Sequence, residues 1–203
     1  YTPNKKGLSA VDKTAANEFI AMETVASNNI ALKEKVINYL NEYCDFNTFE
    51  VAIPALRDPH MAPEGKTGVI VSLLYDYQLA KKIDDAGWTA EINKVLEQRF
   101  IKILDESVFP GFKEKVSHHF SSSPLTIENL CDSTEGGITG WAFTNPYIPV
   151  VNKMLNVAKS VKTIFPSVYQ AGQWVYSPAG MPISVLTGKL ASDKVLKSSK
   201  KKD

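Results

Sequence analysis

The sequence predicts a mixed α+β fold in which a sheet is flanked by helices. Apolar residues with helical spacing, over 14–43 and 89–106, alternate along the chain with strand-like apolar runs at 49–53 and 69–75. A further strand, a loop rich in Gly and Pro and a last helix follow within 167–197. Helices and strands mixed in this way over 203 residues are typical of an α+β chain with a core of its own.

The first half of the chain is predicted to hold helices and strands bounded by residues that favour turns. Polar residues at 27–29 separate two helices within the first helical stretch, and Pro54 limits the first strand. The run 69–75 is almost continuously apolar, so we expect a strand that is buried on both faces. The helix over 89–106 is predicted to begin with Thr89 as its N-cap.

The second half is predicted to hold shorter elements. Apolar and aromatic side chains alternate with polar ones over 116–120, which indicates a third strand. Ser123 followed by Pro124 favours the start of a short helix. A helical stretch over 150–161 precedes the final strand, and residues 198–203 form a charged tail.

Composition and charge exclude several classes of function. The formal net charge is +1 and no basic stretch is interleaved with aromatic residues, so we expect no nucleic-acid partner. Cys44 and Cys131 form no CxxC pair, and the adjacent His118 and His119 would point to opposite faces of a strand, so we expect no metal site. No run of about 18 apolar residues is present, which argues against a transmembrane segment. We expect a cytoplasmic protein, with contact to a membrane surface through the lysines of the tail as the alternative.

The most informative pattern is the strand, loop and helix within 167–197. Gly172 ends the strand, and because it has no Cβ it lets a ligand approach the backbone closely. Gly180 and Pro182 shape the start of the helix, whose free amides can face an electron-rich oxygen. Gly188 lowers the helix propensity, which a close helix-to-strand contact would explain. On these features alone, an ordinary strand, loop and helix without a ligand is the alternative.

Three segments resemble the group of phytoene desaturases, carotenoid isomerases and retinol saturases. The segment 168–191, VYQAGQWVYSPAGMPISVLTGKLA, resembles the C-terminal flavin motif of that group. The segment 53–66, IPALRDPHMAPEGK, resembles its strand-exit element, and 123–128, SPLTIE, resembles the element before its Gly-rich loop. The three segments lie in the expected order within 45–197, and together they are more specific than each one alone.

The resemblance implies an FAD-dependent oxidoreductase with an amine oxidase-like fold. Members of this group desaturate, isomerise or saturate a carbon–carbon bond of a lipophilic polyene or isoprenoid by hydride transfer through the flavin. By this resemblance, residues 1–163 are part of a substrate-binding domain whose sheet is flanked by helices. Residues 164–197 are then the C-terminal strand, loop and helix of a Rossmann-type FAD-binding domain, and 198–203 remain the tail.

The resemblance also places candidate site residues. Gly172 and Gln173 would lie near the ribityl and pyrophosphate side of FAD. The residues at the pyrimidine edge of the flavin would be those at the start of the last helix, namely Gly180, Met181, Pro182 and Ile183. Helix-terminal amides at that edge would stabilise the negative charge of the reduced ring. Aromatic residues often lie in ligand sites, so we expect Trp141 and Trp174 to line an apolar substrate pocket or to flank the ring, with packing in the core as the alternative for each. The pattern identifies no catalytic residue.

One element of this group is not found in the sequence. A GxGxxG turn would receive the pyrophosphate of FAD, but the glycines at 65 and 68, and those at 136, 137 and 140, have a different spacing. We therefore expect the chain to be the C-terminal part of an enzyme, to need a missing N-terminal FAD-binding segment as its partner, and to bind FAD poorly alone. Unpaired strand edges favour self-association, so we expect homo-oligomers. The alternative function is a non-catalytic module that binds a small ligand or a protein.

Overall fold

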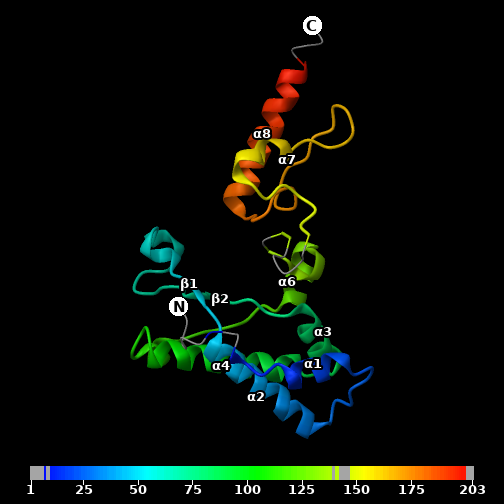
Figure 1. The fold of residues 1–203 in the computed structure, drawn as a ribbon. Coiled ribbons are helices and arrows are strands. Elements are labelled where there is room, and N and C mark those ends of the chain that lie inside the picture. Colours follow the sequence, from blue (N-terminus) through cyan, green and yellow to red (C-terminus); the bar gives the residue numbers. More distant parts are fainter. Residues whose placement is uncertain (1–6, 8–9, 139, 142–146, 200–203) are drawn as a thin grey trace. The chain divides into compact units, whose positions relative to one another are not determined.

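The structure is a computed structural model that describes residues 7, 10–138, 140–141 and 147–199 (Figure 1). The chain divides into two compact units, Tyr1–Thr126 (unit 1) and Ile127–Asp203 (unit 2). Helices predominate, and the described ranges contain one two-stranded sheet, so the predicted α+β class is confirmed. Residues 200–203 of the predicted tail lie outside the described residues, and so does residue 139 of the predicted Gly-rich loop. The predicted boundary at 163–164, between a substrate-binding domain and the last elements of an FAD-binding domain, stays a prediction.

Unit 1 consists of helices and one small sheet. The two helices predicted within 14–43 are confirmed as α1 (Thr14–Ala21) and α2 (Ile30–Phe46). The side chain of Asn29 caps α2 by accepting a hydrogen bond from the amide of Leu32 at 3.1 Å. The predicted long helix is α4 (Thr89–Glu106). The other elements of unit 1 are β1 (Glu50–Ala52), β2 (Ile70–Ser72), α3 (Tyr77–Asp85), α5 (Phe112–Lys115) and the 3-10 helices Pro54–Leu56 and Pro59–Met61.

The core of unit 1 lies among helices α1 to α4, which pack on one another (Figure 1). The ring of Phe19 stacks on Trp88 with their centroids 5.5 Å apart, and Trp88 Nε1 donates a hydrogen bond to the Ser27 carbonyl at 2.8 Å. The guanidinium of Arg99 on α4 forms an ion pair with the carboxylate of Asp45 on α2. The most deeply buried apolar side chains are Phe19, Val36, Leu40, Cys44, Phe49, Ile92 and Leu104.

Burial in this core also raises the pKa of several acidic side chains. Desolvation raises the pKa of the Cys44 thiol and of the Tyr43 phenol to about 12 each, and the Tyr43 hydroxyl donates to the Leu74 carbonyl at 2.6 Å. The pKa values of Tyr39 and Tyr75 are raised for the same main reason. The folded state therefore favours the neutral form of all four groups.

We expect unit 1 to lose stability as the pH rises above the ordinary pKa values of these groups. Below about pH 9 both states hold the protons, so the stabilisation is fully present. Above that pH the unfolded chain releases protons that the folded chain retains, so the free energy of unfolding falls up to pH 12, where Cys44 and Tyr43 also ionise in the folded state. Urea midpoints measured from pH 7 to pH 11 by circular dichroism would show the decline. Cys44→Ala should make the decline shallower, and an unchanged slope in that variant would contradict this account.

The small sheet differs from the prediction in its burial. Strand β1 pairs antiparallel with β2, and Val51 lies opposite Val71. Val51, Val71 and Leu73 pack against the core, whereas Ile70 is 53% exposed and Leu74 is 78% exposed. Alternate side chains of a strand point to opposite faces, and the core covers only one face of this sheet. The prediction that the run 69–75 is buried on both faces is therefore wrong.

The predicted third strand at 116–120 is also wrong, because residues 116–123 have no regular structure. The carboxylate of Glu97 on α4 holds this segment through side chains. His119 Nδ1 lies 2.9 Å from one carboxylate oxygen, and the hydroxyl of Ser121 donates to the other at 2.6 Å. These contacts fix the segment on the surface of α4 without a strand ladder.

The prediction that Thr89 caps α4 is wrong by one position. Trp88 is the N-cap residue, and Thr89 is the first residue of the helix. The hydroxyl of Thr89 donates instead to the carboxylate of Asp84 at 2.7 Å, which connects the end of α3 to the start of α4.

Unit 2 is organised around α8 (Met181–Ser199), which confirms the predicted last helix. The short helix predicted after Ser123 is confirmed as α6 (Pro124–Cys131), which crosses the boundary between the units. Helix α7 (Val157–Ser160) packs on α8 (Figure 1). Two 3-10 helices, Thr134–Gly136 and Met154–Asn156, complete the regular elements described in this unit.

Two predicted elements of unit 2 are shorter than expected. The helix predicted over 150–161 is wrong in its first half, because Val151 is extended and forms a parallel bridge with Tyr176. The strand predicted over 167–171 is reduced to one antiparallel bridge between Lys162 and Tyr169. Ser167 has a left-handed backbone with φ 64°, which interrupts an extended strand at its first residue.

The core of unit 2 is small and partly polar. Among the residues described in this unit, the buried apolar side chains are Val161, Val175 and Tyr176. A Cβ placed on Gly188 in α8 would meet no atom within 4 Å, so the predicted close contact of this glycine with a strand is wrong. No helix in the described ranges is long and apolar enough to cross a bilayer.

Candidate functional site

The candidate site is the bend between Gly172 and Ile183, where two glycines set the backbone direction. Gly172 has φ 111° and Gly180 has φ 146°, which side chains with a Cβ rarely adopt. A Cβ on Gly172 would meet no atom within 4 Å, and one on Gly180 would meet only Pro182 Cδ at 3.9 Å. Both glycines therefore leave open space beside the backbone. The close approach of a ligand, which the sequence indicated for Gly172, stays a prediction.

The hydroxyl of Thr187 ties the two ends of this bend together. Thr187 lies in α8 with no exposed surface, and its Oγ1 accepts a hydrogen bond from the Gly172 amide at 3.1 Å. The same hydroxyl lies 2.9 Å from the Ile183 carbonyl, to which it can donate. Sequence analysis missed this residue. The sequence feature that could have identified Thr187 is a threonine one turn after Ile183, on a helix face where an apolar residue would be expected.

The start of α8 presents free backbone amides at the bend. The Gly180 carbonyl accepts the first helical hydrogen bond, from the Ser184 amide at 2.9 Å. The amides of Met181 and Ile183 have no acceptor among the described residues, and Pro182 carries no N–H. The side chain of Met181 is 82% exposed. The predicted residues 180–183 thus form an accessible helix N-terminus with a partial positive charge.

One buried hydroxyl near this bend lacks a partner. Ser177 has no exposed surface, and its Oγ makes no hydrogen bond within the described part of the chain. The backbone amide of Ser177 donates to the Val151 carbonyl at 3.0 Å, so the backbone at this position is fixed. A buried hydroxyl without a partner is uncommon in folded proteins.

The structure brings the two predicted tryptophans together. Trp141 Nε1 donates to the Trp174 carbonyl at 2.8 Å, and the two rings meet edge to face with centroids 5.6 Å apart. The loop before Trp141 approaches closely, because a Cβ on Gly140 would lie 2.5 Å from the carbonyl oxygen of Gln173. Gln173 and Trp174 are thus contacted by a second segment of unit 2. Trp174 remains 36% exposed, so one side of this aromatic pair faces solvent.

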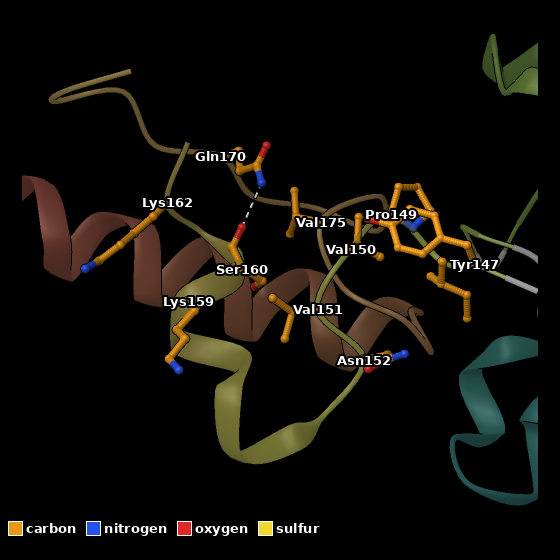
Figure 2. A pocket seen from close by; sticks show the side chains of 11 residues that line it. Tyr147, Pro149, Val150, Val151, Asn152, Lys159, Ser160, Lys162, Gln170 and Val175 are labelled. Atoms are coloured by element: carbon orange, nitrogen blue, oxygen red, sulfur yellow. Dashed lines mark hydrogen bonds between the residues drawn. The ribbon is translucent and has the colours of Figure 1, made fainter. Parts of the chain in front are cut away.

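A hollow of about 600 Å³ lies beside the bend and is lined by one residue of the bend, Val175 (Figure 2). Its wall includes Val151, Val175 and Gln170, and the side chain of Gln170 donates to the Ser160 carbonyl at 2.8 Å. Figure 2 shows this hydrogen bond and the two lysines, Lys159 and Lys162, that also line the hollow. Gln170 precedes the bend and Val175 belongs to it, but none of the eight predicted site residues lines the hollow. The cofactor and substrate contacts assigned to those residues stay predictions.

The described residues contain no group of three or more His, Cys, Asp or Glu side chains that could hold a metal ion. His119, which sequence analysis considered as a ligand, is engaged with Glu97 instead. The candidate site presents backbone amides, hydroxyl groups and aromatic rings.

Comparison with curated proteins finds distantly similar proteins. The chain is 27% identical over 154 residues to the 4,4'-diapophytoene desaturases (4,4'-diaponeurosporene-forming) of Staphylococcus aureus strains Newman and USA300. The chain is thus distantly similar to diapophytoene desaturases. The aligned part is 72% of this chain and 28% of each desaturase, so the chain spans less than a third of these relatives' length. No family profile and no solved structure matches the chain.

This relationship supports the resemblance that the three sequence segments indicated, at the level of the family.

Proposed function

We propose that the chain is the C-terminal part of an FAD-dependent oxidoreductase that acts on carbon–carbon bonds of a lipophilic, polyene- or isoprenoid-like molecule. The observation that carries this proposal is the bend at 172–183, where open glycines precede a helix N-terminus with free amides. The distant relationship to diapophytoene desaturases supports the same assignment. The chain alone is not expected to be catalytically competent.

The residues of the bend fit the edge of a flavin ring. A planar ring needs backbone without a Cβ beside it, which Gly172 and Gly180 provide. When bound, a flavin would exchange a hydride with the substrate and carry the resulting negative charge near its pyrimidine edge. The amides of Met181 and Ile183 would donate hydrogen bonds to that edge, and the helix dipole would add to their effect. The hydroxyl of Ser177 is a further donor that has no partner within the described part of the chain.

Trp141 and Trp174 would form the apolar wall of the substrate site. Their edge-to-face contact and the hydrogen bond between them hold both rings in place. A rigid aromatic wall would orient a lipophilic chain and exclude water from the reacting carbon atoms.

The phosphate and adenine parts of FAD do not find a comparable site in this sequence. The glycine spacing that would receive a pyrophosphate is not found in residues 1–203. The proposal therefore assigns the ring edge to this chain and the pyrophosphate to a different segment of the enzyme.

A titration with three flavins tests whether this chain binds the flavin ring but not the pyrophosphate. Riboflavin, FMN and FAD should quench the fluorescence of Trp141 and Trp174 with similar, weak affinities of about 10 µM to 1 mM, because only the shared ring is bound. Met181→Pro removes one free amide at a helical position that tolerates proline, and it should weaken the binding of all three flavins. Trp174→Phe should reduce the extent of the quench. Absence of binding by every flavin would contradict the proposal, and FAD binding far tighter than riboflavin would contradict the division.

A non-catalytic ligand-binding module is the second candidate function, and the hollow beside the bend favours it. Val150→Trp would fill part of that hollow, whereas Gly180→Val would close the open side of the bend. Loss of flavin binding in Gly180→Val alone supports the oxidoreductase. Loss in Val150→Trp alone supports the module.

A further inference from the structure

One loop of unit 2 holds large apolar side chains in solvent. It spans residues 162–169, KTIFPSVY, follows α7 and projects from the unit (Figure 1). We call it the projecting loop. Ile164 is 91% exposed, Phe165 is 65% exposed and Val168 is 50% exposed. Single exposed apolar residues are common on protein surfaces, whereas three of them within five residues indicate a surface for interaction.

The projecting loop satisfies much of the backbone at its tip by itself. The hydroxyl of Thr163 accepts a hydrogen bond from the Phe165 amide at 3.1 Å and lies 2.9 Å from the Val168 carbonyl. The Val168 amide donates to the Phe165 carbonyl at 3.3 Å, and Pro166 carries no N–H. A segment enters an apolar environment at low cost only if its backbone polar groups have partners. The tip meets most of that requirement before it contacts anything.

The base of the projecting loop holds residue types that favour lipid headgroups. Lys162 is paired with Tyr169 in an antiparallel bridge, and Lys159 precedes them in α7. Figure 2 shows the side chains of Lys159 and Lys162 extending away from Val175, and neither lysine forms an ion pair within the described part of the chain. Lysine and tyrosine are typical of the membrane–water interface, because each combines an apolar body with a polar end. The loop is therefore amphipathic and cationic at its base and apolar at its tip.

The sequence around the projecting loop contains no acidic residue. All 22 Asp and Glu residues of the chain lie outside 136–192, whereas Lys153, Lys159, Lys162 and Lys189 lie within this range. An anionic membrane surface attracts lysines that come within about a Debye length and repels carboxylates at the same distance. A surface without carboxylates thus suits an anionic lipid surface, whereas a protein partner does not require it.

We propose that the projecting loop inserts into the surface of a membrane that contains anionic lipids. Ile164, Phe165 and Val168 would enter the boundary between headgroups and acyl chains, about 5–10 Å deep, while Lys159 and Lys162 would contact the lipid phosphates. This inference goes beyond the proposed function and does not depend on it, since the loop ends before the bend begins. It assigns the membrane contact to the loop rather than to the lysines of the tail.

Sedimentation with lipid vesicles tests the binding of the full chain. The chain should bind vesicles of mixed phosphatidylcholine and phosphatidylglycerol, and should bind pure phosphatidylcholine vesicles more weakly. Phe165→Ser should lower the partition coefficient about tenfold, because it removes a large apolar side chain from the membrane. Lys162→Gln should lower it about fivefold on the anionic vesicles.

Leu155→Ser is the matched control for Phe165→Ser, because Leu155 is fully exposed in the same unit but lies outside the projecting loop. Its partition coefficient should equal that of the unchanged chain. Absence of binding to the anionic vesicles, or an equal loss in Leu155→Ser and Phe165→Ser, would overturn the proposal. Unchanged binding of Lys162→Gln would overturn the contact of this lysine with lipid phosphates.

A fluorescent label tests the insertion itself. Cys131→Ser removes the exposed native cysteine, and Cys44 is buried, so Ile164→Cys in this background can be labelled with a nitrobenzoxadiazole dye. The emission of the dye should shift to shorter wavelength when anionic vesicles are added, whereas a dye on Leu155→Cys should show no shift. Vesicle binding without the shift at position 164 would contradict insertion of the loop. A shift that needs no vesicles and grows with protein concentration would mean that protein covers the loop, which would also overturn the proposal.

Discussion

Trp88→Ala is expected to unfold unit 1 at a much lower urea concentration than the unchanged chain. Trp88 is 2% exposed, stacks on Phe19 and donates a hydrogen bond to the Ser27 carbonyl, so it joins α1, the loop before α2 and the start of α4. Truncating a large buried aromatic side chain costs about 3–5 kcal/mol. That is a large fraction of the roughly 5–15 kcal/mol by which folded domains are stable. Urea unfolding followed by far-UV circular dichroism measures the change.

Trp88→Phe separates the two contributions of this side chain. Phenylalanine keeps an aromatic ring against Phe19 but leaves the Ser27 carbonyl without its donor, so we expect a loss of about 1–2 kcal/mol. An alanine variant as stable as the phenylalanine variant would show that the stacked ring contributes little.

Gly140→Ala is expected to displace the loop that holds the tryptophan pair. The added Cβ would lie 2.5 Å from the Gln173 carbonyl oxygen, so the backbone must move. Gly140 also has φ 78°, where alanine costs about 1 kcal/mol relative to glycine. We expect the Trp141–Trp174 contact to be lost, the near-UV circular dichroism of the pair to collapse and flavin quenching to weaken.

Gly111→Ala is the matched control for this variant. Gly111 has a similar φ of 81°, but a Cβ there would meet no atom within 4 Å. Gly111→Ala therefore has the free-energy cost of the left-handed backbone angle but no steric clash. Equal spectra for Gly140→Ala and the unchanged chain would contradict the close approach of the loop to Gln173.

Local sequence patterns predicted the helices of this chain better than its strands. The spacing of apolar residues identified α1, α2 and α4, and the Gly- and Pro-containing loop indicated the start of α8. A helix satisfies its own backbone hydrogen bonds within the segment. A strand depends on its neighbour. The alternation over 116–120 had no neighbour to pair with, and side chains bound to Glu97 set its conformation instead.

The candidate site was predictable only in part, for a related reason. Gly172 and Gly180 could be recognised from the sequence, because few residues other than glycine adopt their backbone angles. Thr187 and Gly140 matter through contacts with residues 15 and 33 positions away, to Gly172 and Gln173. Such contacts arise from the tertiary fold and leave little trace in local composition.

The polar core of unit 2 has a thermodynamic consequence. Its described buried side chains include three apolar residues, Val161, Val175 and Tyr176, and four hydroxyl-bearing ones, Ser133, Ser160, Ser177 and Thr187. Hydration of apolar surface raises the heat capacity of an unfolded chain, whereas hydration of polar surface lowers it. Melting of unit 2 should thus be accompanied by a small heat-capacity increment for its length, giving it a flatter stability curve than unit 1 and a weaker response to cooling.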